Sequence, residues 1–392
     1  MTTPERSHAI PVPEPGLTPR RMIERATALR SMLRAQQAAC EAAGRILPWV
    51  NDAFLDAGFY RILQPRRFGG YEFDLPAFAE VMIEVTRGCP SSGWVLAFTA
   101  GHTHVLAKFT EQAQIEAYGS HGDLRAPFVG SPGSARPVDG GYLIDGAWDY
   151  ASGCEVATHF LGSAIVRGPN PDDPPGDMLA VLIDREDFEI VENWEILGMR
   201  GTGSHRVVVR DLFLPAHRAS RREAALPTSA QSQSGYSIHD NPMYAGPSSN
   251  ILMAEIAAVA IGTGLGALDC YEEMLRARTT RGPSPTTRAE SPEFQQNFGR
   301  AQALLNTARA ALIGCAHDYM EFCRQAVEED VPFSLERSQA IVLVEQQCTR
   351  LAGEAVELLF YSAGSSAAKP DSMLQRYYRD MATLRTHVTL QF

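Results

Sequence analysis

The chain has 392 residues, which is enough for two or three packed domains and too long for one small core. Hydrophobic residues make up 45% and charged residues 21%, and this ordinary globular usage excludes an intrinsically disordered chain. A formal net charge of -11 repels phosphate backbones, so nucleic acid is not expected as a partner.

The cysteines and the apolar segments indicate the compartment. Seven cysteines are odd in number, widely scattered and never in a CxxC pair, so neither a metal site nor a disulfide framework is expected. The first residues carry Glu5 and Arg6 without an apolar stretch, unlike a signal peptide. The most apolar run, 251–268, contains Glu255 and three glycines, which favours a buried helix over a membrane span. We expect a soluble, cytoplasmic protein with no membrane partner.

In chain order, the first two segments differ in pattern. Residues 1–124 form a predicted N-terminal helical domain, because Ala-, Leu- and Arg-rich stretches are interrupted by single prolines and a Gly-Gly pair. Residues 125–226 form a predicted β-domain, in which Gly, Pro and Asp punctuate short β-rich runs and favour a small antiparallel sandwich or barrel. The expected strands are 142–150, 159–166, 178–183 and 206–214.

The third predicted segment is 227–392. It begins with a polar stretch, 227–249, which is a candidate lid loop carrying Tyr236, His239 and Tyr244. Four long helical patterns then predict an up-down four-helix bundle. Their ranges are 250–278, 292–329, 334–362 and 371–390. The fold class is therefore α+β.

Two motifs fail as cofactor or metal sites. The run from Gly262 to Gly266 (Gly-Thr-Gly-Leu-Gly) lies inside a helical pattern and not after a strand, so it indicates close helix packing and not dinucleotide binding. His102 and His104 are two residues apart, about 200° around a helix, so they cannot bind one ion; at most one of them faces a pocket.

Two loops carry candidate ligand-binding groups. In Trp148-Asp149-Tyr150-Ala151-Ser152-Gly153, strand alternation places Trp148, Tyr150 and Ser152 on one face, where a flat ligand would stack; a plain strand exit is the alternative. The glycine-rich loop 198–204 offers backbone N–H groups with the hydroxyls of Thr202 and Ser204, or is simply a tight turn.

The last helical pattern carries an apolar stripe, and a polar stripe runs beside it. The polar stripe consists of Arg376, Asp380, Thr383 and His387. From spacing alone, His387 could equally be an ordinary histidine whose ring nitrogens are hydrogen-bonded within the protein or a functional residue.

Taken together, these motifs resemble the acyl-CoA dehydrogenase superfamily, and within it the flavin-dependent monooxygenase branch: the oxygenase components of two-component phenol hydroxylases of the 4-hydroxyphenylacetate and secosteroid types. The resemblance runs along nearly the whole chain. Its markers are Phe59 to Pro65 with Gly69-Gly70, Cys89 to Trp94, Trp148 to Gly153, Leu197 to Ser204, Asn241 to Tyr244, Leu374 to Arg376, Arg379-Asp380 and His387.

The resemblance implies an acyl-CoA dehydrogenase-like fold with a helical N-terminal domain, a central antiparallel β-domain and a C-terminal four-helix bundle, assembled as a homotetramer. It also implies an exchangeable reduced FMN or FAD between the β-domain and the bundle, with O₂ as co-substrate. The residues expected at the flavin are Trp148, Tyr150, Ser152, Gly153, Thr202 and Ser204, with Arg278, Gln295 and Phe298 contributed across subunits. The chain has Arg278-Thr279-Thr280-Arg281-Gly282 where the superfamily has a Phe in its RxxFG run, which weakens the assignment of Arg278.

The same resemblance implies catalytic roles for His387, Ser152 and His104. His387 would donate a hydrogen bond to a C4a-hydroperoxyflavin, and Ser152 near N5 would slow its loss of H₂O₂. His104, or His102 in its place, and Ser131 would approach the substrate, and Trp94 would form a wall of its pocket.

The implied reaction is insertion of one oxygen atom into an aromatic or other electron-rich cyclic substrate, with flavin reduced by a separate NAD(P)H:flavin reductase. One alternative is an oxygenase or oxidase acting on a cyclic acyl-CoA thioester. Another is an acyl-CoA dehydrogenase with Glu255 as its base, although residues 364–368 lack the Tyr of that branch and no Glu follows Glu357. The last alternative is a non-enzymatic protein that serves as a binding scaffold.

Overall fold

The computed structural model describes residues 9–168, 170, 174–221, 234–281 and 283–390. The N-terminal part is helical, as predicted. Its helices are α1 (Pro19–Ala43), α2 (Pro48–Ala57), α3 (Leu75–Gly88), α4 (Pro90–Gly101), α5 (Thr103–Leu106) and α6 (Glu111–His121). Proline is at the start of each of the first four, where its missing N–H costs nothing, and the side chains of Thr18 and Asp74 cap α1 and α3.

The central part is one seven-stranded sheet with the order β5-β6-β2-β1-β3-β4-β7. The strands are β1 (Phe128–Val138), β2 (Gly141–Ala151), β3 (His159–Val166), β4 (Met178–Asp184), β5 (Glu189–Val191), β6 (His205–Pro215) and β7 (Ala219–Arg221). The four expected strands correspond to β2, β3, β4 and β6. The expectation of an antiparallel sheet was wrong at one place, because β1 and β3 pair in parallel. The sheet is therefore mixed.

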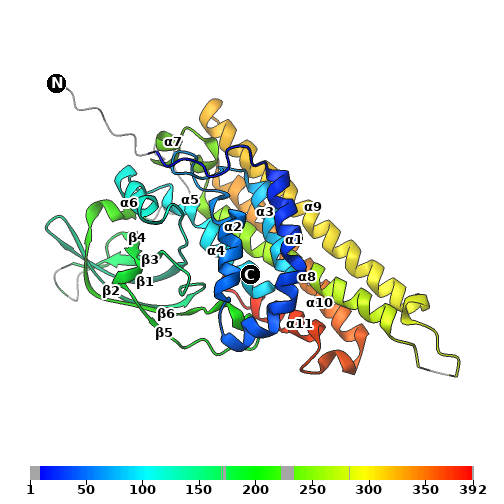
Figure 1. The fold of residues 1–392 in the computed structure, drawn as a ribbon. Coiled ribbons are helices and arrows are strands. Elements are labelled where there is room, and N and C mark those ends of the chain that lie inside the picture. The colour runs from blue at the N-terminus through cyan, green and yellow to red at the C-terminus, as the bar shows by residue number, and fades with distance from the viewer. Residues whose placement is uncertain (1–8, 169, 171–173, 222–233, 282, 391–392) are drawn as a thin grey trace.

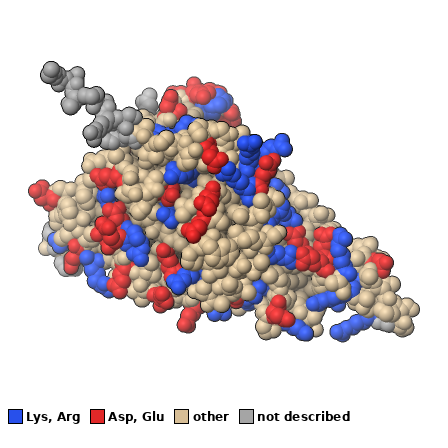
Figure 2. Space-filling view, in the orientation of Figure 1, with Lys and Arg blue, Asp and Glu red and all other residues tan. Residues whose placement is uncertain are grey.

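The C-terminal part is helical. It contains α7 (Ser234–His239), the 3-10 turn η6 (Pro242–Ala245), α8 (Ser248–Ala277), α9 (Pro292–Glu328), α10 (Leu335–Ala363) and α11 (Met373–Leu384). Helix α8 packs against α9, α10 and, on its other side, α3. Figure 1 shows these long helices side by side, reaching past the N-terminal helices on the side away from the sheet. Acidic and basic side chains alternate over the face shown in Figure 2.

Part of the predicted lid, 227–249, is not described, because residues 227–233 lie outside the described ranges. Residues 243–247 are buried, whereas Ser237 and Asp240 are exposed. Tyr244 is fully buried and its hydroxyl donates to the carbonyl oxygen of Leu63. The 243–247 part of the segment therefore belongs to the core and not to an open loop.

Helix α8 is the apolar run expected to be buried. It is long and apolar enough to cross a membrane, but 94% of its most apolar window is buried inside the protein. Its three glycines allow close packing, as predicted: a Cβ at Gly262 would lie 2.6 Å from the carbonyl oxygen of Ile83, and one at Gly266 would lie 2.6 Å from that of Arg87. A core helix thus explains both its hydropathy and its glycines.

The substitution Gly262→Ala should lower the free energy of unfolding by about 1–3 kcal/mol, because the added methyl group meets backbone that cannot rotate away. Gly119→Ala, in α6, is the matched control. A Cβ there meets nothing within 4 Å, so the better helix propensity of alanine should raise stability by about 0.5–1 kcal/mol. Urea unfolding of both variants measures whether the free energy of unfolding falls in Gly262→Ala and rises in Gly119→Ala. Equal effects would contradict close packing at Gly262.

Candidate active site

Three hydroxyl groups from two separate loops form one hydrogen-bonded chain. Ser152 follows β2, and Thr202 and Ser204 lie around the 3-10 turn η3 (Arg200–Thr202), just before β6. The Ser152 Oγ is 2.7 Å from the Ser204 Oγ, which is 2.7 Å from the Thr202 Oγ1. The exposed fractions of these residues are 8%, 3% and 1% for Ser152, Ser204 and Thr202. Two loops that the sequence suggested independently therefore make a single polar site.

Gly153 holds the two loops together. Its N–H donates to the carbonyl oxygen of Thr202 over 3.0 Å. Its φ of 74° lies in the left-handed region, and a Cβ there would lie 2.7 Å from the Val95 side chain on α4. Glycine is thus required at this position for both conformation and space.

Aromatic side chains from α4 form a wall beside the hydroxyl chain. Trp94 donates its Nε1–H to the Ser152 Oγ over 2.9 Å and stacks on Phe98, with ring centroids 4.3 Å apart. The His387 ring lies 5.8 Å from the Trp94 ring and 6.5 Å from the Phe98 ring. Phe98 was not singled out from the sequence, although its spacing of four from Trp94 on a helix is the signal that finds it.

His387 does not belong to the last helix. Helix α11 ends at Leu384, and His387 follows in the turn before the 3-10 turn η9 (Val388–Leu390), which corrects the predicted helix 371–390. Burial lowers the pKa of His387, so the ring is neutral at pH 7. The His387 Nδ1 lies 2.9 Å from the Thr389 Oγ1 and 3.4 Å from the Thr389 backbone nitrogen, so Nδ1 is engaged within the turn and Nε2 is the ring nitrogen that can face a ligand.

The loop that carries Thr202 and Ser204 is docked on α11. The Met199 N–H donates to the Asp380 carboxylate over 2.6 Å, and the Gly198 N–H donates to the Thr383 Oγ1 over 2.9 Å. The Arg379 guanidinium donates to the Leu197 carbonyl oxygen over 2.7 Å. A Cβ at Gly198 would overlap the carbonyl of Arg379. The polar stripe expected on the last helix therefore serves largely to position this loop.

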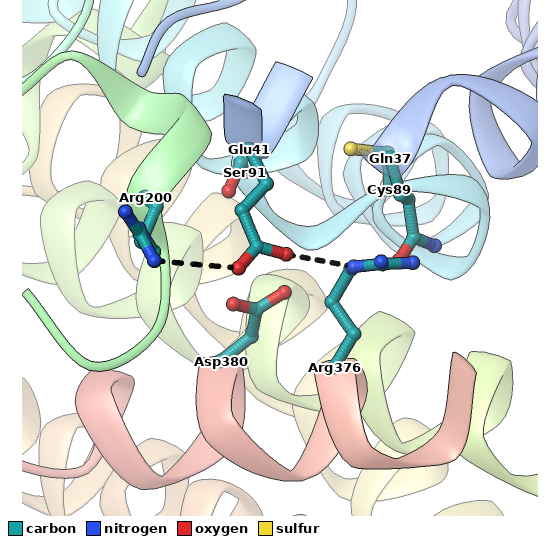
Figure 3. A pocket seen from close by; sticks show the side chains of 7 residues that line it. All are labelled: Gln37, Glu41, Cys89, Ser91, Arg200, Arg376 and Asp380. Carbon is teal, nitrogen blue, oxygen red and sulfur yellow. Dashed lines mark hydrogen bonds and ion pairs between the residues drawn. The ribbon is translucent and has the colours of Figure 1, made fainter. Parts of the chain in front are cut away.

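An ion-pair cluster lies beside this contact (Figure 3). The Glu41 carboxylate on α1 lies 2.7 Å from the Arg376 guanidinium, 2.8 Å from that of Arg379 and 3.8 Å from that of Arg200. The cavity here has a volume of about 10 Å³, which is room for one water molecule and not for a flavin. The cluster thus joins α1, η3 and α11 and is not a ligand site.

The two N-terminal histidines diverge, as their spacing predicted. Both are buried, which lowers the pKa of His102 to about 4 and that of His104 to about 3, so both are neutral. The His102 ring lies edge-on to Phe98 at 5.7 Å, next to the aromatic wall. His104 instead bonds the Ser248 hydroxyl and the Met243 carbonyl oxygen, each at 3.0 Å. A catalytic His104 is therefore not supported, because both ring nitrogens are bonded within the C-terminal part.

Comparison with known proteins identifies the family. The model of the family "Acyl-CoA dehydrogenase, C-terminal domain" matches residues 254–392. The chain is 32% identical over 370 residues to the flavin-dependent monooxygenase, oxygenase subunit HsaA, of Rhodococcus jostii (strain RHA1), with 93% of each chain covered. The chain belongs to the flavin-dependent monooxygenase branch of the acyl-CoA dehydrogenase superfamily.

Two further relatives of this monooxygenase agree with that placement. The crystal structure of 3-HSA hydroxylase from Rhodococcus sp. RHA1 matches it with a TM-score of 0.86 at 30% identity, covering 94% of this chain and 93% of the other. The FADH(2)-dependent resorcinol hydroxylase, oxygenase component, of Rhizobium sp. (strain MTP-10005) is 27% identical over 394 residues, covering 99% and 95%.

Glu255 is a poor candidate for the base of a dehydrogenase. It is fully buried in α8, and burial raises the pKa of its carboxyl group well above the usual range. A Cβ at Gly101 would overlap the carboxyl group, so α4 lies directly over it. A protonated acid enclosed in this way cannot remove a proton from a thioester.

The aromatic residues of the Trp148–Gly153 motif are not where alternation predicted them. The pairing of β2 with β6 shifts between Trp148 and Ala151, and Tyr150 has a φ of 67°. This bulge breaks the alternation. Trp148 is fully buried and donates to the Ser163 carbonyl oxygen, so direct stacking of a flavin on it is excluded. Tyr150 is 70% exposed.

The remaining predicted residues are not among the hydrogen-bond partners of the hydroxyl chain. Ser131 is exposed on β1. Arg278 caps the end of α8 and donates to the Ser366 hydroxyl. Gln295 and Phe298 are in the first turns of α9. The junction of α8 and α9 is far from the sheet in Figure 1. Arg278, Gln295 and Phe298 therefore do not contact Ser152 within one chain.

The substitution Asp380→Asn should change the dependence of stability on pH. Burial raises the pKa of Asp380 from 3.8 to about 6, so its contribution to stability is full below about pH 4 and is lost as the pH rises through 6. The stability of the Asn variant relative to wild type should therefore rise between about pH 4 and pH 7, by at most about 3 kcal/mol. Urea unfolding at both pH values measures it. A difference independent of pH would contradict a buried, titrating Asp380.

Proposed function

We propose that this chain is the oxygenase component of a two-component system, in which a separate NAD(P)H:flavin reductase supplies reduced FMN or FAD. The enzyme uses O₂ to insert one oxygen atom into an aromatic or other electron-rich cyclic substrate. The observation that carries this proposal is the meeting of a buried hydroxyl chain, the Trp94 and Phe98 rings and a neutral His387 in a chain of this family.

The groups at this site fit a flavin. A flavin ring is flat and uncharged over most of its area, with hydrogen-bonding atoms along its edge. The site offers the flat Trp94 and Phe98 rings, three neutral hydroxyls and histidines kept neutral by burial. Exposed Tyr150 and Leu197 (61% exposed) flank the same loops and provide apolar surface that a ligand or a neighbouring subunit would cover. When bound, reduced flavin supplies the electrons that reduce one oxygen atom to water while the other enters the substrate.

The sequence and the fold support a separate reductase. The glycine run from Gly262 to Gly266 lies within α8, packed against α3, and does not follow a strand. It therefore does not form a nicotinamide-binding turn. The resorcinol hydroxylase relative is itself named an oxygenase component.

Each side chain has a distinct proposed role. Ser152, the most exposed of the three hydroxyl residues, holds the flavin ring, and Ser204 and Thr202 hold Ser152 in place through the hydroxyl chain. His387 would donate a hydrogen bond from Nε2 toward the reacting oxygen, which a neutral imidazole can do because one of its two ring nitrogens carries a proton. Trp94 and Phe98 keep water from the reacting atoms. The substrate ring lies against Phe98, with His102 behind it, and not beside His104.

We also propose a cytoplasmic homotetramer. Leu343 and Val344 are exposed neighbours on α10, at 63% and 40%, and provide apolar surface that a subunit contact would cover. Arg278, Gln295 and Phe298 would then reach the flavin of a neighbouring subunit from the far end of the long helices.

The substitution His387→Asn tests the proposal. Single turnovers of the photoreduced, flavin-loaded protein with O₂ and a panel of phenols should yield hydroxylated product in wild type. The variant should bind reduced flavin normally but form about 10²-fold less product, with a matching rise in H₂O₂, because a positioned proton donor contributes about this much.

His317→Asn, at an exposed position on α9, is the control and should behave as wild type. Bleaching of bound flavin by an acyl-CoA without O₂ would favour the dehydrogenase instead. Equal product from wild type and the His387 variant would contradict the role of His387.

A further inference from the structure

The hydroxyl chain has a preferred direction, which follows from counting its protons. The Thr202 Oγ1 lies 2.9 Å from the Met199 carbonyl oxygen. A carbonyl oxygen only accepts, and a hydroxyl has a single proton to donate. Thr202 therefore donates its proton to Met199 and can only accept from Ser204.

The rest of the chain follows from this end. Since Thr202 accepts, Ser204 gives its own proton to Thr202 and accepts from Ser152, so Ser152 gives its proton to Ser204. At the other end, the Trp94 Nε1–H is a donor only, and it donates to the Ser152 Oγ. Every bond from Trp94 to Met199 thus points the same way.

The opposite direction is disfavoured by the same geometry. If Thr202 gave its proton to Ser204, the Thr202 and Met199 oxygens would face each other across 2.9 Å with no proton between them. The Met199 carbonyl oxygen would still accept from the Trp194 Nε1–H over 3.0 Å and from the Thr202 N–H over 3.2 Å, so the cost is one lost hydrogen bond and two opposed acceptors.

This direction decides what Ser152 offers to a ligand. Its proton is directed to Ser204 and one of its two acceptor positions is filled by Trp94, which leaves one acceptor position. Ser152 is also the most exposed of the three hydroxyl residues. At this point the site presents an acceptor and no proton.

We propose that Thr202 is a positioning residue that, acting through Ser204, makes Ser152 an acceptor and so selects reduced over oxidised flavin. Reduced flavin carries a proton on N5 and can donate it in a hydrogen bond, whereas N5 of oxidised flavin is itself an acceptor. The inference rests on the proposed function, and it assigns the preference for the reduced form to a side chain that need not touch the flavin.

The substitution Thr202→Val tests this, because valine keeps the shape of threonine and removes the hydroxyl. Without Thr202 as acceptor, Ser204 can turn its proton to Ser152, and Ser152 can donate to the ligand. The ratio of the Kd for oxidised flavin to the Kd for reduced flavin should fall about tenfold, the worth of one such bond. The midpoint potential of the bound flavin should fall with it by about 30 mV.

The measurements are anaerobic fluorescence titrations with oxidised and dithionite-reduced FMN and FAD, and a redox titration of the bound flavin. Thr202→Ser keeps the hydroxyl and should keep the wild-type ratio. Ser204→Ala breaks the chain at the next position and should lower the ratio as Thr202→Val does, which preserves the test if the valine variant does not fold.

The outcomes separate the two proposals. An unchanged ratio in both Thr202→Val and Ser204→Ala, with wild type still binding reduced flavin more tightly, overturns the role of Thr202 and leaves the proposed function intact. A wild-type protein that prefers oxidised flavin overturns the direction of the chain. A wild-type protein that binds flavin in neither state overturns the proposed function and this inference together.

Discussion

The docking of the 197–204 loop on α11 is the contact on which the candidate site depends. Three backbone groups of the loop, at Leu197, Gly198 and Met199, are bonded by side chains of α11. Three to five residues further on, the same loop supplies Thr202 and Ser204 to the hydroxyl chain. The turn after α11 supplies His387. One short loop thus sets the distance between the hydroxyls and the imidazole, and Gly198 allows its backbone to approach the helix closely enough.

Burial keeps the candidate site uncharged, and the ion pairs that join the surrounding helices lie beside the site and not in it. His102 and His387 are neutral because burial lowers the pKa of each, and Glu255 is protonated because burial raises its pKa. The Glu41 carboxylate with its arginines forms a separate cluster at the junction of α1, η3 and α11. Hydrogen bonds from neutral groups in such a low-dielectric site are stronger than in water, and their direction matters more.

Local chemistry in the sequence was sufficient to find the two loops. Ser152, Thr202 and Ser204 were accessible to prediction because hydroxyl residues next to glycines mark turns that can present donors and acceptors. The buried helix α8 and its packing glycines were also predictable, because composition and period are properties of the segment itself.

Features that depend on pairing between distant segments were not predictable. The bulge in β2 sends Trp148 into the core and Tyr150 to the surface, and it depends on the register with β6. The parallel pairing of β1 with β3 arises in the same way. His102 and His104 could not be ranked by spacing, because the choice depends on where Met243 and Ser248 pack. Phe98 is the exception, because its spacing of four from Trp94 on α4 is a local signal that places the two rings side by side.

The most direct test of the central contact is the affinity of a Gly198→Ala variant for reduced flavin. Its added methyl group must displace the loop from the Arg379 carbonyl. With native circular dichroism retained, we expect the anaerobic Kd for reduced flavin to rise about tenfold or more, since at least one well-placed hydrogen bond of the hydroxyl chain moves with the loop. A folded variant that binds reduced flavin as tightly as wild type would show that the docking of this loop does not hold the site together.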